Sequence, residues 1–553
     1  MMQDFKKIDY ELLTKPTGDP FSEVGGYVIK FLSEQYPEKD IISLIKHVSN
    51  IYIDRWNAGL HMFFLNSTIT QSAKGYQTPK EKKEKTEKYF TDLLQGIING
   101  INGTCRITGK ETILYKAGRE NSFLTGSGAF LNFHHGLDTG IMLSKEAIIK
   151  FFFVPYGTEI IYDKIGVIGS NIPEIVEYYV NKVVERNNYN SLFKFTQRSK
   201  YTTIANALFG FTDDLITNLN VVIETKKDIS LTLYHFTNFS TSPTIDIHTI
   251  PSKVFHFYYQ CQATRLQQDW NKFIKANYIK YKGHQSKYDQ SSNSYVEQVN
   301  ELYGIEENEL EKLRNDKSLN FDLYSFNCQI DSKTLKNYIL FDVGEYDHWK
   351  TGKIFKNWKE HNPDKANKLK EKCKKFKEVK TLQYHENYYS YKWINIIYNK
   401  LIQGESIISN ILKWSKKNEF NFKIVRYYQE IVKNMNTKTL DLIEKLSDYI
   451  IMNESDIKSN ISKLRTNNAS FLRSFFIRLI EKNYKDCSKE PLVTLREYVE
   501  FLFPSGIYWK EIRDLMLICV FQKLHEQQKF IEDFENNEVD DFERDIEDGN
   551  TDY

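Results

Sequence analysis

Apolar residues recur at helical spacing in several stretches of the N-terminal half. Residues 40–56 (DIISLIKHVSNIYIDRW) place Ile, Leu and Val three to four positions apart, which predicts an amphipathic helix. Residues 172–187 (IPEIVEYYVNKVVERN) predict a second helix, with a proline near its first turn. The charged stretch 79–90 (PKEKKEKTEKYF) leads into a third helix that we expect to end near Gly100.

Other stretches predict turns and strands. Residues 17–27 (TGDPFSEVGGY) are rich in turn formers, and their Gly-Gly pair allows a close approach of another backbone. Residues 61–75 (HMFFLNSTITQSAKG) predict an apolar strand that runs into a polar turn. The apolar run 147–155 (AIIKFFFVP) predicts a buried strand, and residues 228–259 predict two strands around an Asn/Ser/Pro turn.

From about Tyr388 onward the pattern is helical almost throughout. Residues 471–482 (FLRSFFIRLIEK) carry one apolar stripe, and residues 509–530 form a helix with a broad apolar face. Residues 491–506 begin with a proline and end at Pro-Ser-Gly, which frames another helix. Helices with short connections predict a compact bundle.

These patterns predict an α+β protein of several parts. A mixed α/β N-terminal body is followed by an all-α C-terminal helical bundle, and the length favours two or three domains. The expected divisions are a mixed body over 1–360, which includes a glycine-laced lobe at 103–157 and a polar excursion at 276–317, a basic junction at 361–387, the helical bundle at 388–530 and an acidic tail at 531–553.

The composition predicts a soluble intracellular protein. Of the 553 residues, 41% are hydrophobic and 14% aromatic, which is ample for globular folding. The six cysteines show no paired spacing, which fits a reducing cytosol better than a disulfide framework. The N-terminus has no apolar signal core, and no run approaches 18 apolar residues. We therefore expect a cytoplasmic location and no membrane partner.

Charge is distributed unevenly along the chain. Residues 531–553 hold 11 acidic residues and one Arg, a net of −10, so the other 530 residues carry +12 against the overall +2. A basic body with an acidic tail is compatible with contact to nucleic acid. A disordered tail that only aids solubility is the equally weighted alternative.

The densest basic segment is residues 361–380, with eight Lys and three acidic residues, a net of +5. It follows Trp349 and Trp358, and its proline is placed to start a helix. One interpretation is a patch that follows a phosphate backbone, and the other is an ordinary solvated helix face. The candidate contacts are Lys365, Lys368, Lys370, Lys372, Lys374 and Lys375.

No catalytic constellation is evident. The chain contains no phosphate-binding G-x-x-x-x-G-K-[ST] loop and no G-x-S-x-G nucleophile motif. His134, His135 and Asp138 are weak metal-ligand candidates, because adjacent histidines on a strand point in different directions. We therefore expect a non-catalytic protein, with a DNA-processing enzyme centred on these residues as a minor alternative.

Glycine recurs through residues 103–157 around one cysteine and two histidines, which suggests the outline of a zinc knuckle. A structural zinc site needs four nitrogen or sulfur donors, usually from Cys-x-x-Cys pairs. Here Cys105 and Thr108 would be the first pair, and Ser144 and Ala147 offer no thiol for the second. We predict a degenerate, metal-free lobe and no cofactor.

The order of several motifs resembles a known family. The opening TGDPFSEVGGY resembles the G-D-P-F-x-x-x-G-G start of the large subunit of type I-B CRISPR Cascade, in the Tneap subtype named for its CXXC–CXXC pattern. FFLNST at 63–68 is similar to that family's aromatic-Asn-Ser turn, and LYHFTNFSTSPTIDIHTIPSKVFHF at 233–257 to its Y-x-F-x-N segment. Cys105, Thr108, Ser144 and Ala147 occupy the positions of its two cysteine pairs. The resemblance covers about the first 260 residues.

The resemblance implies a subunit of an RNA-guided surveillance complex in antiviral defence. Guide RNA reads the target in such complexes, while protein reads a short flanking motif (the PAM) on duplex DNA. The implied partners are the other Cascade subunits, the 5′ handle of the CRISPR RNA, target double-stranded DNA with its displaced strand, and the recruited nuclease-helicase. A structural or interaction protein that reads no nucleic acid is the alternative.

The implied PAM contacts lie in two loops of the N-terminal body. They are Asn66–Lys74, with Asn66, Ser67 and Lys74 as candidates, and Thr237–Ser242 around Asn238. Plain turn chemistry is the alternative for both. The resemblance also implies that translation from Met435 yields a separate small subunit of 553 − 435 + 1 = 119 residues, with Met452 as a substitute start.

Overall fold

The structure is a computed structural model, and its described part divides into two compact units. Unit 1 comprises Met1–Tyr281 and Ser390–Tyr553, and unit 2 comprises Lys282–Tyr389. The described residues are 10–56, 59–125, 140–190, 198–219, 228–238, 244–262, 265–281, 287–302, 307–319, 335, 358, 361–374, 377–452, 456–486, 491–503 and 509–527.

Helix α2 (Pro20–Gln35) lies at the centre of the N-terminal part of unit 1, and α1 (Tyr10–Thr14) precedes it. The Asp19 side chain caps α2 by accepting a 2.6 Å hydrogen bond from the backbone N–H of Ser22. The turns predicted for 17–27 therefore end at Asp19, because an acidic cap followed by proline starts a helix. The prediction of turns beyond that point is wrong.

The predicted close approach at the Gly-Gly pair is confirmed. A Cβ atom on Gly25 would lie 2.0 Å from the carbonyl oxygen of Lys150, so only glycine allows α2 to cross α5 (Lys145–Phe153) here. Lys150 is fully buried, and its Nζ donates a 2.6 Å hydrogen bond to the carbonyl oxygen of Lys15. Burial lowers the pKa of Lys150 to about 8.

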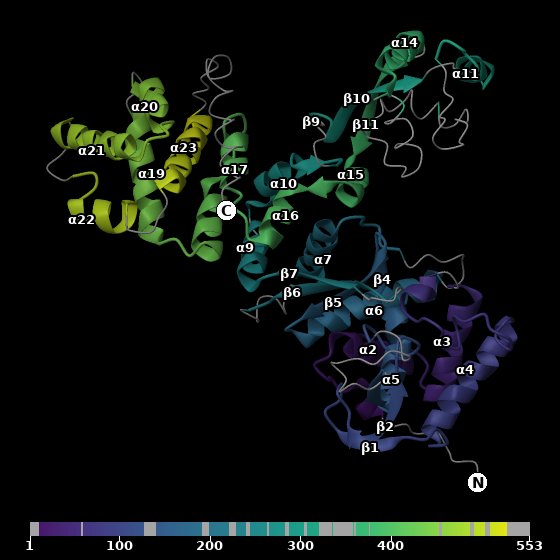
Figure 1. The fold of residues 1–553 in the computed structure, drawn as a ribbon. Coiled ribbons are helices and arrows are strands. Elements are labelled where there is room, and N and C mark those ends of the chain that lie inside the picture. The colour runs from purple at the N-terminus through teal and green to yellow at the C-terminus, as the bar shows by residue number, and fades with distance from the viewer. Residues whose placement is uncertain are drawn as a thin grey trace. The chain divides into compact units, whose positions relative to one another are not determined.

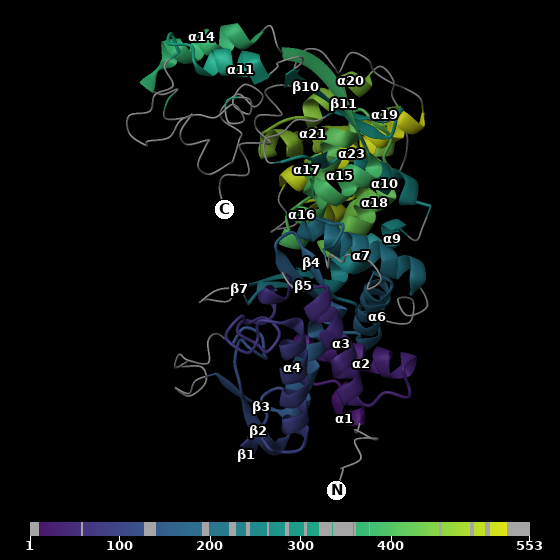
Figure 2. The ribbon, with the colours of Figure 1, turned by 90° about the vertical axis from the view of Figure 1, so that its right-hand side faces the viewer.

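The helices expected at 40–56 and 172–187 are confirmed as α3 (Ile41–Asp54) and α6 (Pro173–Asn190). Helix α4 (Pro79–Leu94) begins inside the charged stretch rather than after it, because Thr78 and Glu81 form a capping box there. Helices α3 and α4 lie side by side in both ribbon views (Figure 1 and Figure 2).

Two small antiparallel sheets pack with these helices. One has the order β4-β5-β6-β7 and the other the order β1-β2-β3. The two strands predicted within 228–259 are confirmed as β6 and β7, whereas the end of that range is helix α9 (Ser252–Gln262). The strands are β1 (Ile101–Thr104), β2 (Glu111–Ala117), β3 (Ile141–Ser144), β4 (Glu159–Ile161), β5 (Lys164–Ser170), β6 (Leu231–Thr237) and β7 (Thr244–Ile250).

The strand predicted for 147–155 is wrong. These residues form α5 and the short 3-10 helix η3 (Val154–Gly157), and the Ser144 hydroxyl caps α5 by accepting from the N–H of Ala147 at 3.3 Å. Every residue from Ala147 to Phe153 is buried. A short helix that is covered on all sides has the same uniformly apolar sequence as a buried strand.

The strand predicted at the start of 61–75 is also wrong. The regular structure there is the 3-10 helix η1 (Gly59–Met62), and turns follow it. The Ser67 hydroxyl accepts hydrogen bonds from the N–H groups of Ile69 and Thr70, at 3.3 and 3.2 Å. This local bonding competes with a strand and fixes a turn instead.

The rest of unit 1 is mostly helical, and the C-terminal helical region agrees with the prediction. The framed helix at 491–506 begins later than expected, because the capping box of Thr494 and Glu497 sets its start rather than the proline. The elements are α7 (Ile204–Asn218), α10 (Gln267–Lys275), β8 (Tyr278–Ile279), α15 (Glu386–Lys392, shared with unit 2), β12 (Ile394–Asn395), α16 (Ile396–Gln403), α17 (Ile408–Ser415), α18 (Phe422–Tyr427), η5 (Tyr428–Val432), α19 (Thr437–Met452), α20 (Ile457–Leu464), α21 (Ala469–Asp486), α22 (Leu495–Glu497), η7 (Tyr498–Leu502) and α23 (Trp509–Glu526).

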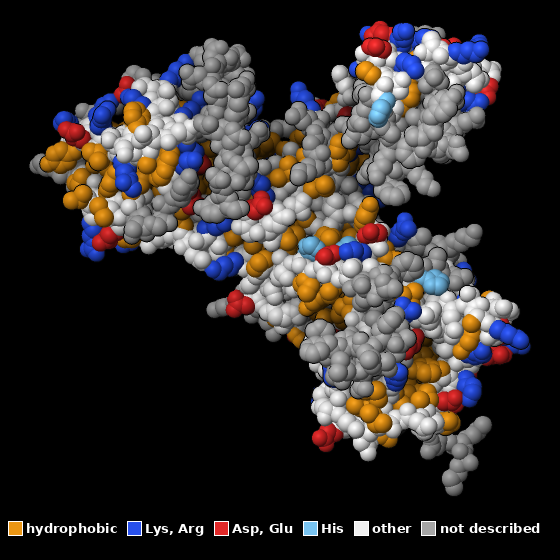
Figure 3. All heavy atoms as spheres, viewed as in Figure 1, with side chains coloured by type: hydrophobic (Ala, Val, Ile, Leu, Met, Phe, Trp, Pro, Cys, Tyr) orange, Lys and Arg blue, Asp and Glu red, His pale blue; other side chains and the backbone are white. Residues whose placement is uncertain are grey.

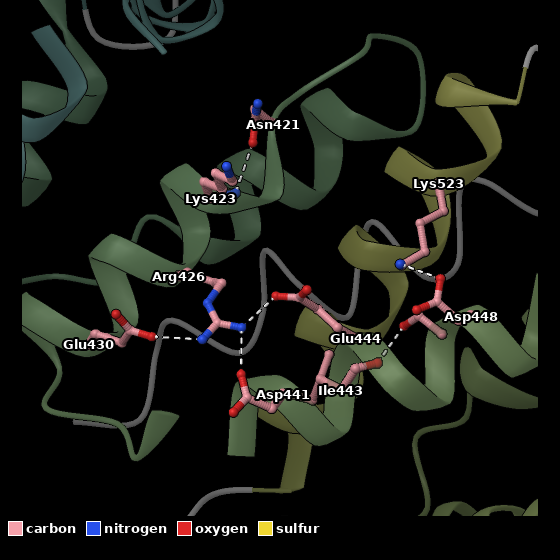
Figure 4. A network of polar contacts seen from close by, with 10 residues as sticks. Asn421, Lys423, Arg426, Glu430, Asp441, Ile443, Glu444, Asp448 and Lys523 are labelled. Carbon is pink, nitrogen blue, oxygen red and sulfur yellow. Dashed lines mark hydrogen bonds and ion pairs between the residues drawn. The ribbon is translucent and has the colours of Figure 1, made fainter. Parts of the chain in front are cut away.

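An ion-pair network joins two helices of the C-terminal region (Figure 4). Arg426 of α18 bonds to Glu430 at 3.1 Å and reaches across to α19, where it contacts Asp441 at 2.8 Å and Glu444 at 2.7 Å. Partial burial lowers the pKa of the guanidinium, but the bonds to Glu444 and Asp441 outweigh burial and raise it. One side chain thus fixes α18 against α19.

Unit 2 is organised by a three-stranded antiparallel sheet in the order β11-β10-β9. It includes most of the predicted polar excursion, whose β9 (Lys287–Asp289) and β10 (Ser294–Leu302) pair with each other, while β11 (Lys377–His385) comes from the predicted basic junction. Two helices, α11 (Glu307–Arg314) and α14 (Pro363–Cys373), complete the described elements. As predicted, Pro363 starts α14.

Candidate nucleic-acid interface

The segments that carry the family resemblance pack together in one aromatic cluster. Phe21 of the opening motif lies 4.9 Å from Phe236 of β6, measured between ring centroids. Phe123, in the glycine-laced stretch, lies 5.7 Å from Phe236 and 5.4 Å from Phe64 of the FFLNST segment. All four rings are buried. Segments more than 200 residues apart in sequence therefore meet in one core, through edge and stacked ring contacts that favour a fixed geometry.

Asn238 joins three of these segments through its amide. The side-chain NH2 group donates to the carbonyl oxygens of Phe63 at 2.9 Å and Ser122 at 3.2 Å, and the side-chain oxygen accepts from the N–H of Leu124 at 3.2 Å. Its own backbone N–H donates to the Met62 carbonyl at 3.0 Å. Asn238 is only 1% exposed, so this predicted contact residue lies in the interior and positions loops.

Asn238 bonds to Met62 and Phe63, just before the Asn66–Lys74 loop, whereas residues 239–242 of the other predicted loop lie outside the described residues. Asn66 is exposed and has a left-handed backbone with φ of 60°. Ser67 is buried, and its hydroxyl is hydrogen-bonded to the hydroxyl of Thr70. Lys74 is exposed. Of the predicted contacts here, Asn66 and Lys74 are therefore accessible to a ligand, and Ser67 supports the turn.

A pocket of about 130 Å³ opens next to this loop. Its apolar walls come from α4, α5 and the FFLNST segment, and polar side chains lie among them. The lining residues are Phe64, Asn66, Ser67, Thr68, Ile69, Gln71, Tyr89, Phe90, Glu120, Asn121, Ile148 and Phe152.

The four positions expected for the degenerate zinc site also come together. The Cys105 sulfur accepts a 3.3 Å hydrogen bond from the N–H of Ser144, whose hydroxyl in turn accepts from the N–H of Ala147. Burial alone would raise the pKa of the Cys105 thiol, but bonds from Thr108 and Ser144 outweigh burial and lower it.

The residues at this site do not fit a structural zinc ion. They offer one thiol, two hydroxyls and a methyl group, where zinc takes four nitrogen or sulfur donors. Within the described ranges no group of three His, Cys, Asp or Glu side chains could hold a metal ion. His134, His135 and Asp138 lie outside those ranges.

The predicted lysine patch is mainly the exposed surface of α14. Lys368, Lys370, Lys372 and Lys374 are exposed and Lys365 is half-buried, whereas Lys375 lies outside the described residues. Lys372 forms an ion pair with Asp316, and Lys374 pairs with Glu371 at 2.7 Å. Basic and acidic side chains therefore both surround α14 in Figure 3.

Trp358, which precedes the lysine patch, offers no stacking surface. This side chain is 1% exposed, so its ring is not available for a base to stack on. Trp349 lies outside the described residues. The patch consequently offers cations but no described tryptophan platform.

Sequence reasoning missed the pocket, whose walls come from residues up to 88 positions apart (64 to 152). It also missed a half-buried carboxyl group, Asp213 of α7, which accepts a 2.6 Å hydrogen bond from the Tyr258 hydroxyl. A Phe-Thr-Asp-Asp run inside an otherwise apolar helix was the available signal. Burial raises the pKa of Asp213 to about 7, although the Tyr258 bond lowers it.

Comparisons with known proteins add no relative: no family model, curated protein or solved structure matches this chain. Across the described helices, none combines the length and apolar character needed to cross a bilayer.

Proposed function

We propose that this chain is the large subunit of a type I-B CRISPR RNA-guided surveillance complex, which recognises the PAM on double-stranded DNA. In this role it aids duplex opening, stabilises the displaced strand and helps to recruit the nuclease-helicase. We propose no catalytic step for the chain itself, and a cytoplasmic location.

The observation that carries the proposal is the convergence of the resemblance's motifs. Phe21, Phe64, Phe123 and Phe236 come from four separate motif segments and pack in one cluster, and Asn238 bonds to two of those segments. Their convergence supports reading them as parts of one module.

The accessible groups next to the cluster suit contact with DNA. Asn66 and Lys74 are exposed on the loop that follows Phe64 of the cluster. Amide and ammonium groups are the types that contact base edges and phosphates. In unit 2, α14 presents further exposed lysines, which suit a phosphate backbone in a sequence-independent way.

The deciding experiment compares assembled complexes with and without this chain. Binding is measured to duplexes that differ only in the candidate PAM, at about 50, 150 and 300 mM salt, because phosphate contacts make affinity depend on salt. We expect PAM-dependent binding to disappear when the chain is omitted. If it persists, the proposal is wrong and the structural alternative stands.

A double variant tests the basic helix within the same assay. Lys368→Ala with Lys370→Ala should weaken binding to all duplexes alike and flatten the salt dependence by about one to two counterions. The matched control is Lys458→Ala with Lys463→Ala, which removes two exposed lysines from α20. If both pairs of substitutions weaken DNA binding equally, the lysines of α14 are not part of the interface.

A further inference from the structure

The pocket beside Asn66 combines flat apolar walls with polar groups. Phe64, Phe90 and Phe152 contribute aromatic rings, and the Phe90 and Phe152 rings pack against each other with their centroids 4.8 Å apart. Ile148 of α5 is fully buried beneath them. The three rings are almost fully buried, so they form a rigid apolar floor that a ligand contacts over a small area, not a platform on which a base stacks.

Three polar side chains of this lining make no hydrogen bond or ion pair within the described part of the chain: Asn66, Gln71 and Glu120. The phenol oxygen of Tyr89 accepts a 2.9 Å bond from the Asn121 amide, which leaves the phenol proton available for another acceptor. The pocket thus holds one carboxylate acceptor and several N–H or O–H donors that have no protein partner among the described residues.

One residue of the pocket lining, Asn66, has a strained backbone conformation. Asn66 adopts a left-handed conformation with φ of 60°, which non-glycine residues adopt infrequently although Asn tolerates it best. Its exposed side chain is held at the pocket by turns on both sides, since the N–H of Leu65 donates to the Arg119 carbonyl at 2.9 Å and Ser67 binds Thr70. Strained residues of this kind cluster where a ligand is held.

The size of the pocket selects among planar ligands. At about 130 Å³ it is close to an engineered apolar cavity of about 150 Å³ that accommodates benzene. One six-membered ring therefore fits inside the pocket, whereas the fused rings of a purine would extend past its rim.

We propose that this pocket binds a single unpaired cytosine base. The Glu120 carboxylate would accept from the exocyclic N4 amino group, and the amides of Asn66 and Gln71 with the Tyr89 hydroxyl would donate to N3 and O2. Thymine or uracil would present O4, a second acceptor, to the carboxylate. Asn66 and Gln71 of the lining are exposed or partly exposed, so an extruded or single-stranded base reaches the pocket from solvent.

This inference deepens the proposed function by naming a base that the DNA-binding loop would hold. Its test uses the full chain alone and two fluorescein-labelled heptanucleotides, all thymidine or thymidine with one central cytidine. We expect the cytidine strand to bind at least about fivefold more tightly by fluorescence anisotropy, from the discrimination of one well-placed hydrogen-bonding pair.

Variants locate the effect. Glu120→Ala should lower the affinity for the cytidine strand to that for the thymidine strand. Gln71→Trp should have the same effect, because the larger side chain would fill the opening of the pocket. Glu111→Ala removes an exposed carboxylate from β2, away from the pocket lining, and should leave the preference intact. Circular dichroism of each variant checks that the fold is retained.

Equal affinity for the two strands, or a cytidine preference that survives both Glu120→Ala and Gln71→Trp, would overturn the pocket assignment. Neither result bears on PAM-dependent binding by the assembled complex. Conversely, a cytidine preference that Glu120→Ala abolishes would stand even if the complex bound its duplexes without this chain.

Discussion

Asp213→Asn should make the protein more stable at neutral and alkaline pH. Asp213 of α7 is packed against α9, where Tyr258 donates its hydroxyl proton to the carboxyl oxygen. The Tyr258 oxygen also lies 3.3 Å from the Tyr398 oxygen and accepts from the Gln262 amide at 3.0 Å. No cation is bonded to Asp213 in the described structure, so its negative charge is poorly compensated.

The magnitude follows from linkage between protonation and folding. Burial raises the pKa of Asp213 from 3.8 to about 7, so the folded state binds the proton more tightly than the unfolded state between these values. Stability therefore falls as the pH rises from about 4 to about 7, and stays low above that. At 1.36 kcal/mol per pH unit the loss is at most about 4 kcal/mol, and about 2 kcal/mol once the partial exposure of Asp213 is allowed for.

Asn mimics the protonated carboxyl and keeps an oxygen that accepts from Tyr258. We expect Asp213→Asn to be about 2 kcal/mol more stable than the wild type at pH 8, and more stable by a smaller margin at pH 4.5. Urea unfolding at both pH values, followed by tryptophan fluorescence, measures this, because the Trp270 ring lies 6.2 Å from the Tyr258 ring and reports on this core.

The neighbouring carboxylate provides the control. Asp214 accepts from Lys182 at 2.5 Å and from the Tyr178 hydroxyl at 2.9 Å. Asp214→Asn loses this ion pair but also removes a charge that raises the pKa of Asp213, so its gain at pH 8 should be smaller than that of Asp213→Asn. The reasoning is refuted if Asp213→Asn is less stable than the wild type at pH 8, or if both proteins lose stability in parallel between pH 4.5 and 8.

Three further substitutions test the packing that positions the candidate interface. Gly25→Ala should prevent recovery of folded protein in an expression assay, because its Cβ would overlap the Lys150 carbonyl, whereas Gly18→Ala faces open space and should cost only about 1 kcal/mol for its positive φ. Asn238→Ala should cost about 2–3 kcal/mol in urea unfolding, because it leaves buried carbonyl and N–H groups without partners. Arg426→Met should cost about 1–2 kcal/mol at low salt and less at high salt, since it removes contacts to three partly exposed carboxylates.

The periodicity of apolar residues predicted helices correctly where one face of the helix is exposed to solvent. Helices α3 and α6 follow their patterns closely because their exposed positions are polar. The pattern failed at Ala147–Phe153, where every position is buried and helix and strand give the same apolar run. It also misplaced helix starts at Pro20 and Leu495, where a capping side chain sets the boundary.

The candidate interface was less accessible to sequence reasoning. Motif order pointed to two loops but not to their exposure. Asn238 and Ser67 are buried and support turns, whereas Asn66 and Lys74 are exposed. Whether a polar residue is exposed depends on segments distant in sequence. The pocket depends on such segments even more, because Tyr89, Glu120 and Phe152 belong to three separate elements or turns.

In the glycine-laced lobe, hydrogen bonds and apolar packing hold Cys105, Ser144 and Ala147 together. In a zinc-bound lobe the metal would contribute about 10–16 kcal/mol to folding, whereas each hydrogen bond contributes about 1 kcal/mol net. The bonds around Cys105 therefore cannot replace a metal by themselves. The core makes up the difference: Cys105, Leu114, Leu143 and Ala147 belong to the same buried cluster as α2 and α3, so the lobe is anchored by apolar contact along β2, β3 and α5. Cys105 then acts as a small buried hydrogen-bond acceptor, which requires one sulfur and not four.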